Sequence, residues 1–274
     1  MEYIEIGLQV DCNFRCPYCI SEQSDHWEKL SCLDKDKLIL WLKTHTKGNE
    51  LLSLTGGEPL MWRGLEELIT SIPNQMLINT NLSLLNKNEW IFNKSLINKI
   101  CFRIGLHPTV RTDNYIEEIK RIKDFGFHYI VNYMVSNKDI DYKKTEQILI
   151  DNNINYELSS EVTLGSKHRE KNFESSHLKT WNVIDQNKGA VIRGDGRVLE
   201  CQGSYVQLGS IYNNTFKNPK RTKRPCYFCG GLKGYSKILS SWECFNFDKL
   251  VMSKSRVFKP YYKEILNALK IIKE

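Results

Sequence analysis

The stretch "YIEIGLQVDCNFRCPYC", residues 3–19, joins a strand-like segment to three cysteines. Its first half alternates apolar and polar side chains, which is typical of a β-strand. Cys12, Cys16 and Cys19 follow directly with the spacing C-x3-C-x2-C. Thiols this close together bind a metal or cluster or form disulfides, and the rest of the sequence has to decide between these. The stretch therefore predicts a chemically active loop directly after the first strand.

The change from strand to polar loop recurs along the first 160 residues, where short apolar segments alternate with amphipathic ones. The expected strands are 3–10, 50–55, 75–81, 99–107, 127–135 and 154–160. The expected helices are 34–45 with Asp34 as its cap, 63–72, 86–95, a helix with Tyr115, Ile116, Ile119 and Ile122 on one face, and 141–152. This alternation predicts an α/β fold with a parallel sheet, in which chemistry collects at the carboxyl ends of the strands.

Composition narrows the class of protein. The chain has 274 residues, a formal net charge of +7 and nine cysteines. It has no run of 18 apolar residues, so no membrane span is expected. Its start carries two Glu and no basic segment, which argues against a secretory signal. We therefore expect a cytoplasmic protein whose thiols are reduced and serve as metal ligands or reactive groups.

One dense basic cluster, "KNPKRTKRP", occupies residues 217–225. Two prolines interrupt it, and such a cluster is typical of a solvated loop. It could also attract an acidic peptide or nucleic acid. Without interleaved aromatic residues, nucleic acid is the less favoured partner.

The three thiolates of the opening loop leave a tetrahedral metal one ligand short. A structural zinc site normally has four protein ligands, and His26 could supply the fourth. Iron–sulfur clusters also take cysteines at such close spacings, and an unfilled position can hold a bound ligand. Both interpretations remain open from this loop alone.

Two motifs together resemble those of the radical S-adenosylmethionine (radical SAM) enzymes. "CNFRCPYC" is similar to the C-x3-C-x-aromatic-C motif of that family, and "TGGEP", residues 55–59, is similar to its GGE motif. The resemblance covers residues 1–160 and implies a partial (β/α)6, TIM-like barrel. It implies that Cys12, Cys16 and Cys19 bind three irons of a [4Fe-4S] cluster whose fourth iron chelates S-adenosyl-L-methionine (SAM). The reduced cluster would then cleave SAM to a 5′-deoxyadenosyl radical that abstracts a substrate hydrogen.

The resemblance also implies roles for residues around the cofactor. Gly56, Gly57 and Glu58, followed by Pro59, would contact the amino group of SAM, and Tyr18 would lie near its adenine. A carboxylate suits that cationic group, and glycine lets backbone carbonyls approach it.

Four further polar residues fall at or near the ends of the expected strands. We expect these to contact the cofactor or substrate, although strand-end polar side chains equally often satisfy local backbone groups. They are Asn79, Asn81, His107 and Asn132.

A second cysteine set lies after residue 180. Alone, its C-x2-C nucleus fits a structural zinc ribbon. Behind the barrel it resembles the twitch or SPASM extension of radical SAM enzymes, which carries auxiliary iron–sulfur clusters. A SPASM domain would place a cysteine before the Asp195–Gly196 turn, and this chain has none there, so the smaller twitch domain with one auxiliary [4Fe-4S] cluster is the better match. The set consists of Cys201, Cys226, Cys229 and Cys244.

The expected domains are a radical SAM partial barrel over 1–160, a linker or cover over 161–180, a small cysteine-rich α+β, twitch-like domain over 181–250, and a C-terminal helix over 251–274 that packs back. Cys32 and Cys101 belong to neither cysteine set. Most such cysteines are inert and buried. We predict that Cys101, if it faces the barrel interior, donates a hydrogen atom to a substrate radical.

The resulting hypothesis is a radical SAM enzyme that cross-links, epimerises or dehydrogenates a ribosomally made peptide. The alternative is the same chemistry on a small molecule such as an aminosugar, a nucleoside or another natural-product intermediate. A non-catalytic zinc or cluster protein is the remote alternative. The expected electron donor is a flavodoxin or ferredoxin.

Overall fold

The computed structural model describes residues 3–16, 32–107, 114–135, 142–160, 189–200 and 207–218. Several sequence predictions fall on other residues and so lie outside the described part. These are Tyr18, Cys19, His26, Cys201, Cys226, Cys229, Cys244, the linker 161–180, most of the basic cluster and the C-terminal helix.

The core of the fold is one curved, ten-stranded sheet with the order β10-β9-β8-β7-β1-β2-β3-β4-β5-β6. Strands β1 to β6 are parallel and follow chain order, which confirms the six predicted strands. Their bounds are Tyr3–Gly7, Leu51–Thr55, Met76–Thr80, Ile100–Leu106, His128–Val135 and Tyr156–Ser160. Within the described ranges the sheet does not close, and β10 and β6 are its two ends, so the partial barrel is confirmed.

The strands after residue 188 extend this same sheet beyond β1. Strand β7 pairs parallel with β1, and β8, β9 and β10 continue antiparallel. The predicted Asp195–Gly196 turn is confirmed between β7 and β8, with Gly196 at a φ of 79°. The bounds are Gly189–Ile192, Arg197–Leu199, Gln207–Ser210 and Thr215–Phe216. The chain beyond the first six strands is therefore part of the sheet as far as it is described.

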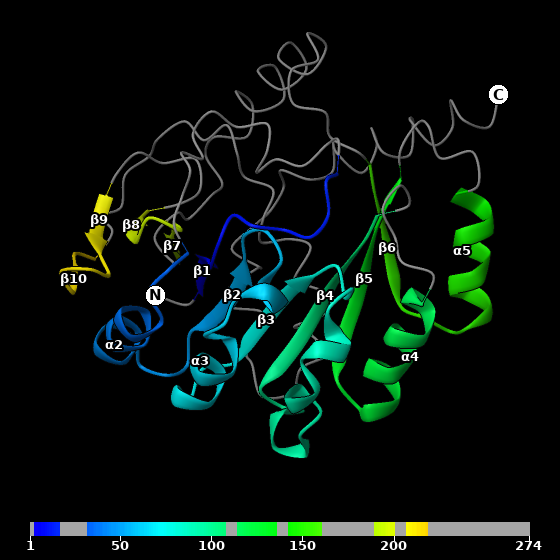
Figure 1. Cartoon of the computed structure of the whole chain (residues 1–274), viewed down its shortest axis with the longest axis horizontal. Helices are drawn as coiled ribbons and strands as arrows, with labels where there is room; N and C mark the ends of the chain where they lie inside the picture. Colours follow the sequence, from blue (N-terminus) through cyan, green and yellow to red (C-terminus); the bar gives the residue numbers. More distant parts are fainter. Residues whose placement is uncertain are drawn as a thin grey trace, which may run out of the picture.

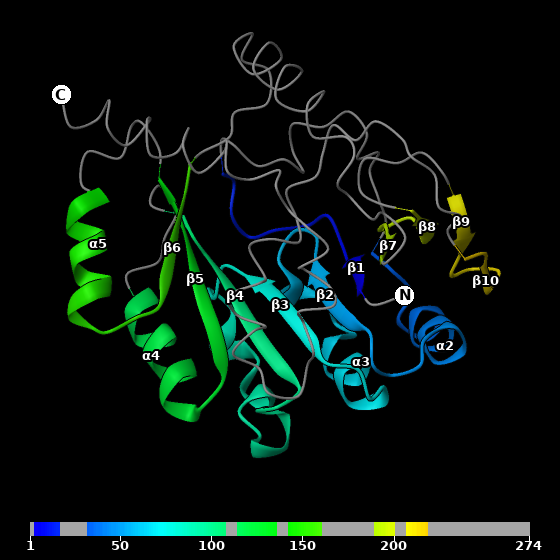
Figure 2. The same ribbon diagram turned by 180° about the vertical axis from the view of Figure 1, so that it is seen from behind.

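The four α-helices in the described ranges line one side of the row of strands, from α2 beside β10 to α5 beside β6 (Figures 1 and 2). Asp34 caps α2 as predicted, since its side chain accepts a hydrogen bond from the Lys37 N–H at 2.9 Å. The bounds are Lys35–His45 for α2, Leu65–Ser71 for α3, Tyr115–Phe125 for α4 and Tyr142–Asp151 for α5. No helix in the described ranges is long and apolar enough to cross a membrane.

The prediction of a helix over 86–95 is wrong. Three 3-10 turns stand there instead, because asparagine side chains bond to the backbone in place of an α-helical ladder. Asn88 donates to the carbonyls of Leu60 and Leu84, and Asn93 accepts from the Ser95 N–H. The turns are η2 (Leu85–Lys87), η3 (Glu89–Ile91) and η4 (Lys94–Leu96), and a similar turn, η1 (Pro59–Met61), follows β2.

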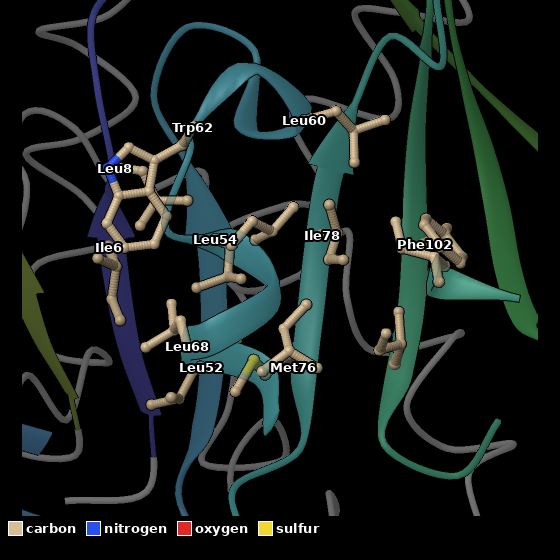
Figure 3. Close-up of a cluster of buried hydrophobic side chains, with 14 of the residues drawn as sticks. Ile6, Leu8, Leu52, Leu54, Leu60, Trp62, Leu68, Met76, Ile78 and Phe102 are labelled. Carbon is tan, nitrogen blue, oxygen red and sulfur yellow. The ribbon is translucent and has the colours of Figure 1, made fainter. Parts of the chain in front are cut away.

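Alternate residues of each strand pack under the helices and form the main hydrophobic core. Figure 3 shows Ile6, Leu54 and Ile78 from three adjacent strands pointing into this layer. Leu60 and Trp62, which follow the TGGEP loop, join the same core, and the Trp62 indole donates to the Leu33 carbonyl at 3.2 Å. The loop is thereby anchored by buried side chains just beyond it.

The other residues of each strand face the inner side of the curved sheet. Glu5, Ser53, Leu77 and Cys101 lie in one register row, from β1 across to β4. Cys101 is fully buried there, and burial raises the pKa of its thiol. Strand alternation thus places Cys101 on the inner side, as its predicted role requires.

Helix α2 packs against the far end of the sheet through Trp41. The buried Trp41 indole donates to the Thr215 carbonyl of β10 at 3.1 Å and meets the Phe216 ring edge-on at 5.4 Å. This contact ties the strands after residue 188 to a helix near the start of the chain.

Replacing Trp41 with Ala should lower the free energy of unfolding by about 3–5 kcal/mol, because a large buried side chain is lost. Trp41→Phe should cost about 1 kcal/mol, because it mainly removes the bond to Thr215. Denaturant unfolding followed by circular dichroism measures both. The control is Leu40→Ala on the exposed side of α2 (Leu40 is 49% exposed), which should stay within about 0.5 kcal/mol of wild type. A Trp41→Ala variant as stable as this control would contradict the packing.

Candidate active site

The site is built on two loops that leave the carboxyl ends of β1 and β2. Backbone hydrogen bonds continue the pairing of these strands past their ends. The Leu8 N–H donates to the Thr55 carbonyl at 2.9 Å, Gly57 to Gln9 at 2.7 Å, and Glu58 to Asp11 at 3.0 Å. The segment just before Cys12 is therefore fastened to the TGGEP loop by main-chain bonds alone.

Both glycines of TGGEP are required by this close approach. A Cβ on Gly56 would lie 2.3 Å from the Gln9 carbonyl oxygen, and one on Gly57 would lie 1.9 Å from that of Asp11. Gly56 also has a φ of +128°, which L side chains rarely adopt. The family resemblance implies that these glycines contact the cofactor, and the close approach of the two backbones is an additional reason for glycine at both positions.

Glu58 is the buried centre of the site, with 1% of its surface exposed. Its Oε1 accepts hydrogen bonds from the Leu60 N–H at 3.0 Å and the Thr80 hydroxyl at 2.6 Å. Its Oε2 accepts from the Asn81 N–H at 2.8 Å. Burial raises the pKa of this carboxyl, and the three hydrogen bonds act in the opposite direction. Glu58 thus ties the loop after β2 to the end of β3.

Two partners of the Glu58 loop were missed by the sequence analysis. Thr80 bonds to the carboxylate, and the Gln9 amide donates to the backbone carbonyls of Asp11 and Glu58 at 3.3 Å and 3.2 Å. Nothing in the sequence singles them out except that Thr80 stands between two asparagines at a strand end.

Cys12 and Cys16 are the two predicted cluster ligands in the described part of the chain. The Cys12 sulfur accepts from the Phe14 N–H at 3.4 Å and from the Asn81 amide nitrogen at 3.8 Å. Cys16 is buried, with 9% of its surface exposed. N–H donors directed at a cysteine sulfur are typical of iron–sulfur sites, where they stabilise the thiolate. These two residues therefore fit the cluster that the sequence implies, and Cys19, the third, lies outside the described residues.

The other predicted rim residues do not all lie beside the cysteine loop. Asn81 contacts both Cys12 and Glu58, whereas the Asn79 amide donates to the Ser53 hydroxyl and the Leu54 carbonyl within the sheet. His107 directly follows β4, and Asn132 lies in the neighbouring strand β5. Gly105 pairs with Asn132, and a Cβ on it would meet the His107 ring at 2.9 Å. Burial lowers the pKa of His107 to about 4, so its imidazole is neutral near pH 7.

Cys101 lies below this rim. Its strand position is three residues before Ile104, which pairs with Thr80. At about 3.3 Å per residue, this places Cys101 about 10 Å down the sheet from the level of Thr80.

Sequence comparison finds GTP 3′,8-cyclases, and no protein-family model matches the chain. The enzyme of Helicobacter pylori is 31% identical over 94 residues, which are 32% of this chain and 29% of that protein. The Hydrogenovibrio crunogenus enzyme is 31% identical over 103 residues, 35% of this chain and 31% of the other. The matched parts thus span under a third of these two relatives. The Clostridium perfringens enzyme is 23% identical over 239 residues, 77% of this chain and 72% of the other.

Solved structures share the fold at low sequence identity. Streptococcus suis SuiB has a TM-score of 0.55 and 13% identity, covering 77% of this chain and 63% of its own. Native anSMEcpe with bound AdoMet and the Cp18Cys peptide has a TM-score of 0.53 and 14% identity, covering 93% and 86%. With the paired cysteine and GGE loops, these sequence and fold relatives identify the chain as a member of the radical SAM superfamily.

Proposed function

We propose that this enzyme reductively cleaves SAM and uses the resulting radical to modify a peptide. The observation that carries this proposal is the direct connection between the two motifs: Asn81 bonds to Cys12 with its side chain and to Glu58 with its backbone. A cluster on Cys12, Cys16 and Cys19 would therefore lie beside the carboxylate proposed to hold the amino group of SAM. When bound, the cluster supplies the electron that breaks a C–S bond of SAM.

Glu58 has the acceptor capacity that this role needs. A carboxylate oxygen can accept about two hydrogen bonds. Oε1 accepts two from the described residues and Oε2 accepts one, which leaves a position on Oε2 for an ammonium donor. Burial raises the pKa of Glu58, and a neighbouring cation would act in the opposite direction and favour its ionised form. The residue thus supports both the loop and the cofactor.

We propose that the second cysteine set, Cys201, Cys226, Cys229 and Cys244, holds one auxiliary [4Fe-4S] cluster in a twitch-like domain. The twitch-like pattern has an Asp-Gly turn, a cysteine shortly after it and then a strand with Gly-x-Ile. The turn between β7 and β8 and the strand β9, which runs into Gly209–Ile211, support this proposal. Such a cluster would accept the electron that the substrate radical gives up when it is oxidised, or it would bind the substrate.

Two substrate classes remain, each supported by a different comparison. A peptide is supported by the fold shared with anSMEcpe, whose structure contains a peptide and which covers 93% of this chain. The basic residues 217–225 would suit an acidic peptide. A nucleotide is supported by the GTP 3′,8-cyclases, one of which matches 77% of the chain. We favour the peptide.

Flavodoxin or ferredoxin is the proposed electron donor. The remaining proposed contacts of the cofactor or substrate are Tyr18, Asn79, His107 and Asn132.

The anaerobically reconstituted protein should contain about eight irons per chain. The variant with Cys12, Cys16 and Cys19 replaced by Ala should retain about four irons and produce no 5′-deoxyadenosine from SAM and dithionite. Replacing Cys226 and Cys229 should also remove about four irons but leave SAM cleavage measurable. Iron analysis and chromatography of the nucleoside provide the measurements, and Cys32→Ala is the control with wild-type values.

Two results would contradict this assignment. About four irons with one zinc in the wild type would overturn the auxiliary cluster. An intact first cluster that yields no 5′-deoxyadenosine would overturn the proposed enzyme.

Glu58→Gln should weaken SAM binding about 10- to 100-fold, because a charge-assisted hydrogen bond contributes about 1.5–3 kcal/mol. Anaerobic equilibrium dialysis with labelled SAM measures this Kd. The matched control is Glu50→Gln, another buried carboxylate, which accepts from the Lys47 and Gly48 N–H groups in a different loop. Both variants should lose stability, but only Glu58→Gln should lose affinity. Equal SAM affinity in the two variants would contradict the proposed role of Glu58 in binding SAM.

The substrate class is tested by turnover with SAM and reductant. A candidate acidic precursor peptide should change mass and consume SAM beyond the uncoupled rate, whereas GTP should not. GTP consumption without peptide modification would favour the nucleotide instead.

Cys101→Ala tests the proposed hydrogen-atom donor: it should abolish the final product and leave 5′-deoxyadenosine formation intact.

A further inference from the structure

We propose that Asn81 is a positioning residue that raises the reduction potential of the cluster held by Cys12. The inference rests on the proposed function, since it requires a cluster in the cysteine loop. It begins from one residue that joins the two motifs: the Asn81 backbone N–H donates to Glu58 Oε2 at 2.8 Å, and its side-chain nitrogen donates to the Cys12 sulfur at 3.8 Å.

The orientation of the Asn81 amide is fixed by its neighbours. Its oxygen accepts from the Ser83 N–H at 3.0 Å and from the Ser83 hydroxyl, so this end is the acceptor. Its nitrogen donates to the Asn13 side-chain oxygen at 3.2 Å, and Asn13 donates in turn to the Ser83 hydroxyl at 2.7 Å. Rotating the amide by 180° would set its oxygen against the Asn13 oxygen and its N–H groups against the Ser83 N–H. The network therefore directs an N–H donor, and not an oxygen, at the sulfur.

The backbone around Asn81 is held in the conformation that this arrangement needs. Leu82 has a φ of 63°, which non-glycine residues rarely adopt, and its N–H donates to the Thr80 hydroxyl at 3.0 Å. Thr80 also donates to Glu58, so the turn after β3 is fixed from the same buried carboxylate. Strained backbone of this kind persists where the surroundings over-determine it.

A hydrogen bond to a cluster sulfur favours the reduced state. Reduction adds one electron and so one negative charge to the cluster and its thiolates, and a donor N–H stabilises that charge. Within the described residues Cys12 receives two such donors, from Phe14 and Asn81. The Phe14 donor belongs to the backbone, so Asn81 is the donor that a substitution removes.

The experiment uses the full chain, reconstituted anaerobically, with iron and sulfide measured first. The cluster is titrated with dithionite in the presence of mediators and followed by electron paramagnetic resonance. The signal of the first cluster is the one that changes on adding SAM. In Asn81→Ala the ratio of reduced to oxidised cluster at a fixed potential should fall about tenfold, which for one electron corresponds to about 59 mV.

Asn81→Asp is a second variant that tests how the side chain at this position affects the reduction potential of the cluster. It keeps the shape of the side chain and an oxygen for the Ser83 donors, but it replaces the N–H donor with a negative charge. The ratio should therefore fall further than in Asn81→Ala. If Asn81 has a merely structural role, the ratio in Asn81→Ala stays at the wild-type value, which overturns the inference. The control is Asn88→Ala, which removes an amide that donates to Leu60 and Leu84 and should change the ratio less than twofold.

The outcomes distinguish the two proposals. A wild-type chain that binds no cluster overturns the proposed function and this inference with it. Equal iron content and equal ratios in wild type, Asn81→Ala and Asn81→Asp overturn the inference alone. If both Asn81 variants lose the cluster while Asn88→Ala retains it, Asn81 has a structural role and the inference is overturned as well.

Discussion

The site depends on the main-chain contact between the loops after β1 and β2. Two hydrogen bonds, from Gly57 to Gln9 and from Glu58 to Asp11, hold the cysteine loop beside the end of β2. These bonds need the backbones to approach so closely that a Cβ on Gly57 would lie within 1.9 Å of a carbonyl oxygen. The first consequence is a strict requirement for glycine, and the second is that the residue after the glycines is forced inward. Glu58 is buried because the loop that carries it is pinned.

A carboxylate buried in this way would be costly alone, and the end of β3 compensates by supplying donors. Thr80 and Asn81 bond to Glu58, and Asn81 passes the connection on to Cys12. The carboxyl ends of three adjacent strands are thus joined through the side chains of Glu58 and Asn81. Burial raises the pKa of Glu58, so folding favours the protonated form of this carboxyl. The stability of the folded protein therefore falls as the pH rises through that raised pKa, because the ionised carboxylate is costly to bury. A cationic ligand beside it would relieve that cost, so binding of such a ligand would be coupled to the stability of the loop.

The sequence was sufficient for the features that depend on local pattern. The six parallel strands, the Asp34 cap, the turn before β8 and the placement of both motifs at strand ends follow from apolar period, capping and glycine position. It failed at residues 86–95, where asparagine side chains compete for the backbone and tertiary bonds such as that from Asn88 to Leu60 decide the conformation. The partners of Glu58 were also beyond it, because Thr80 and Gln9 acquire their roles only from register between strands. The same is true of β7, whose pairing with β1 joins residues nearly two hundred positions apart.

That pairing also bears on how the two cysteine sets relate. Strand β7 runs parallel to β1, so its carboxyl end lies at the same edge of the sheet as the loop of Cys12. Strand β8 runs the other way, and Leu199 is level with Val191 and hence with Glu5, inside β1. The last described residue of this segment, Glu200, therefore lies toward the opposite edge of the sheet from the TGGEP loop. The chain therefore enters the segment that begins at Cys201, which lies outside the described residues, from the side of the sheet opposite the loop of Cys12. The fully buried Cys101 lies in the same register row as Leu199. A substrate radical formed at the rim would have to reach down the inner face of the sheet to meet that thiol, so the proposed hydrogen-atom donation requires a substrate that penetrates the barrel.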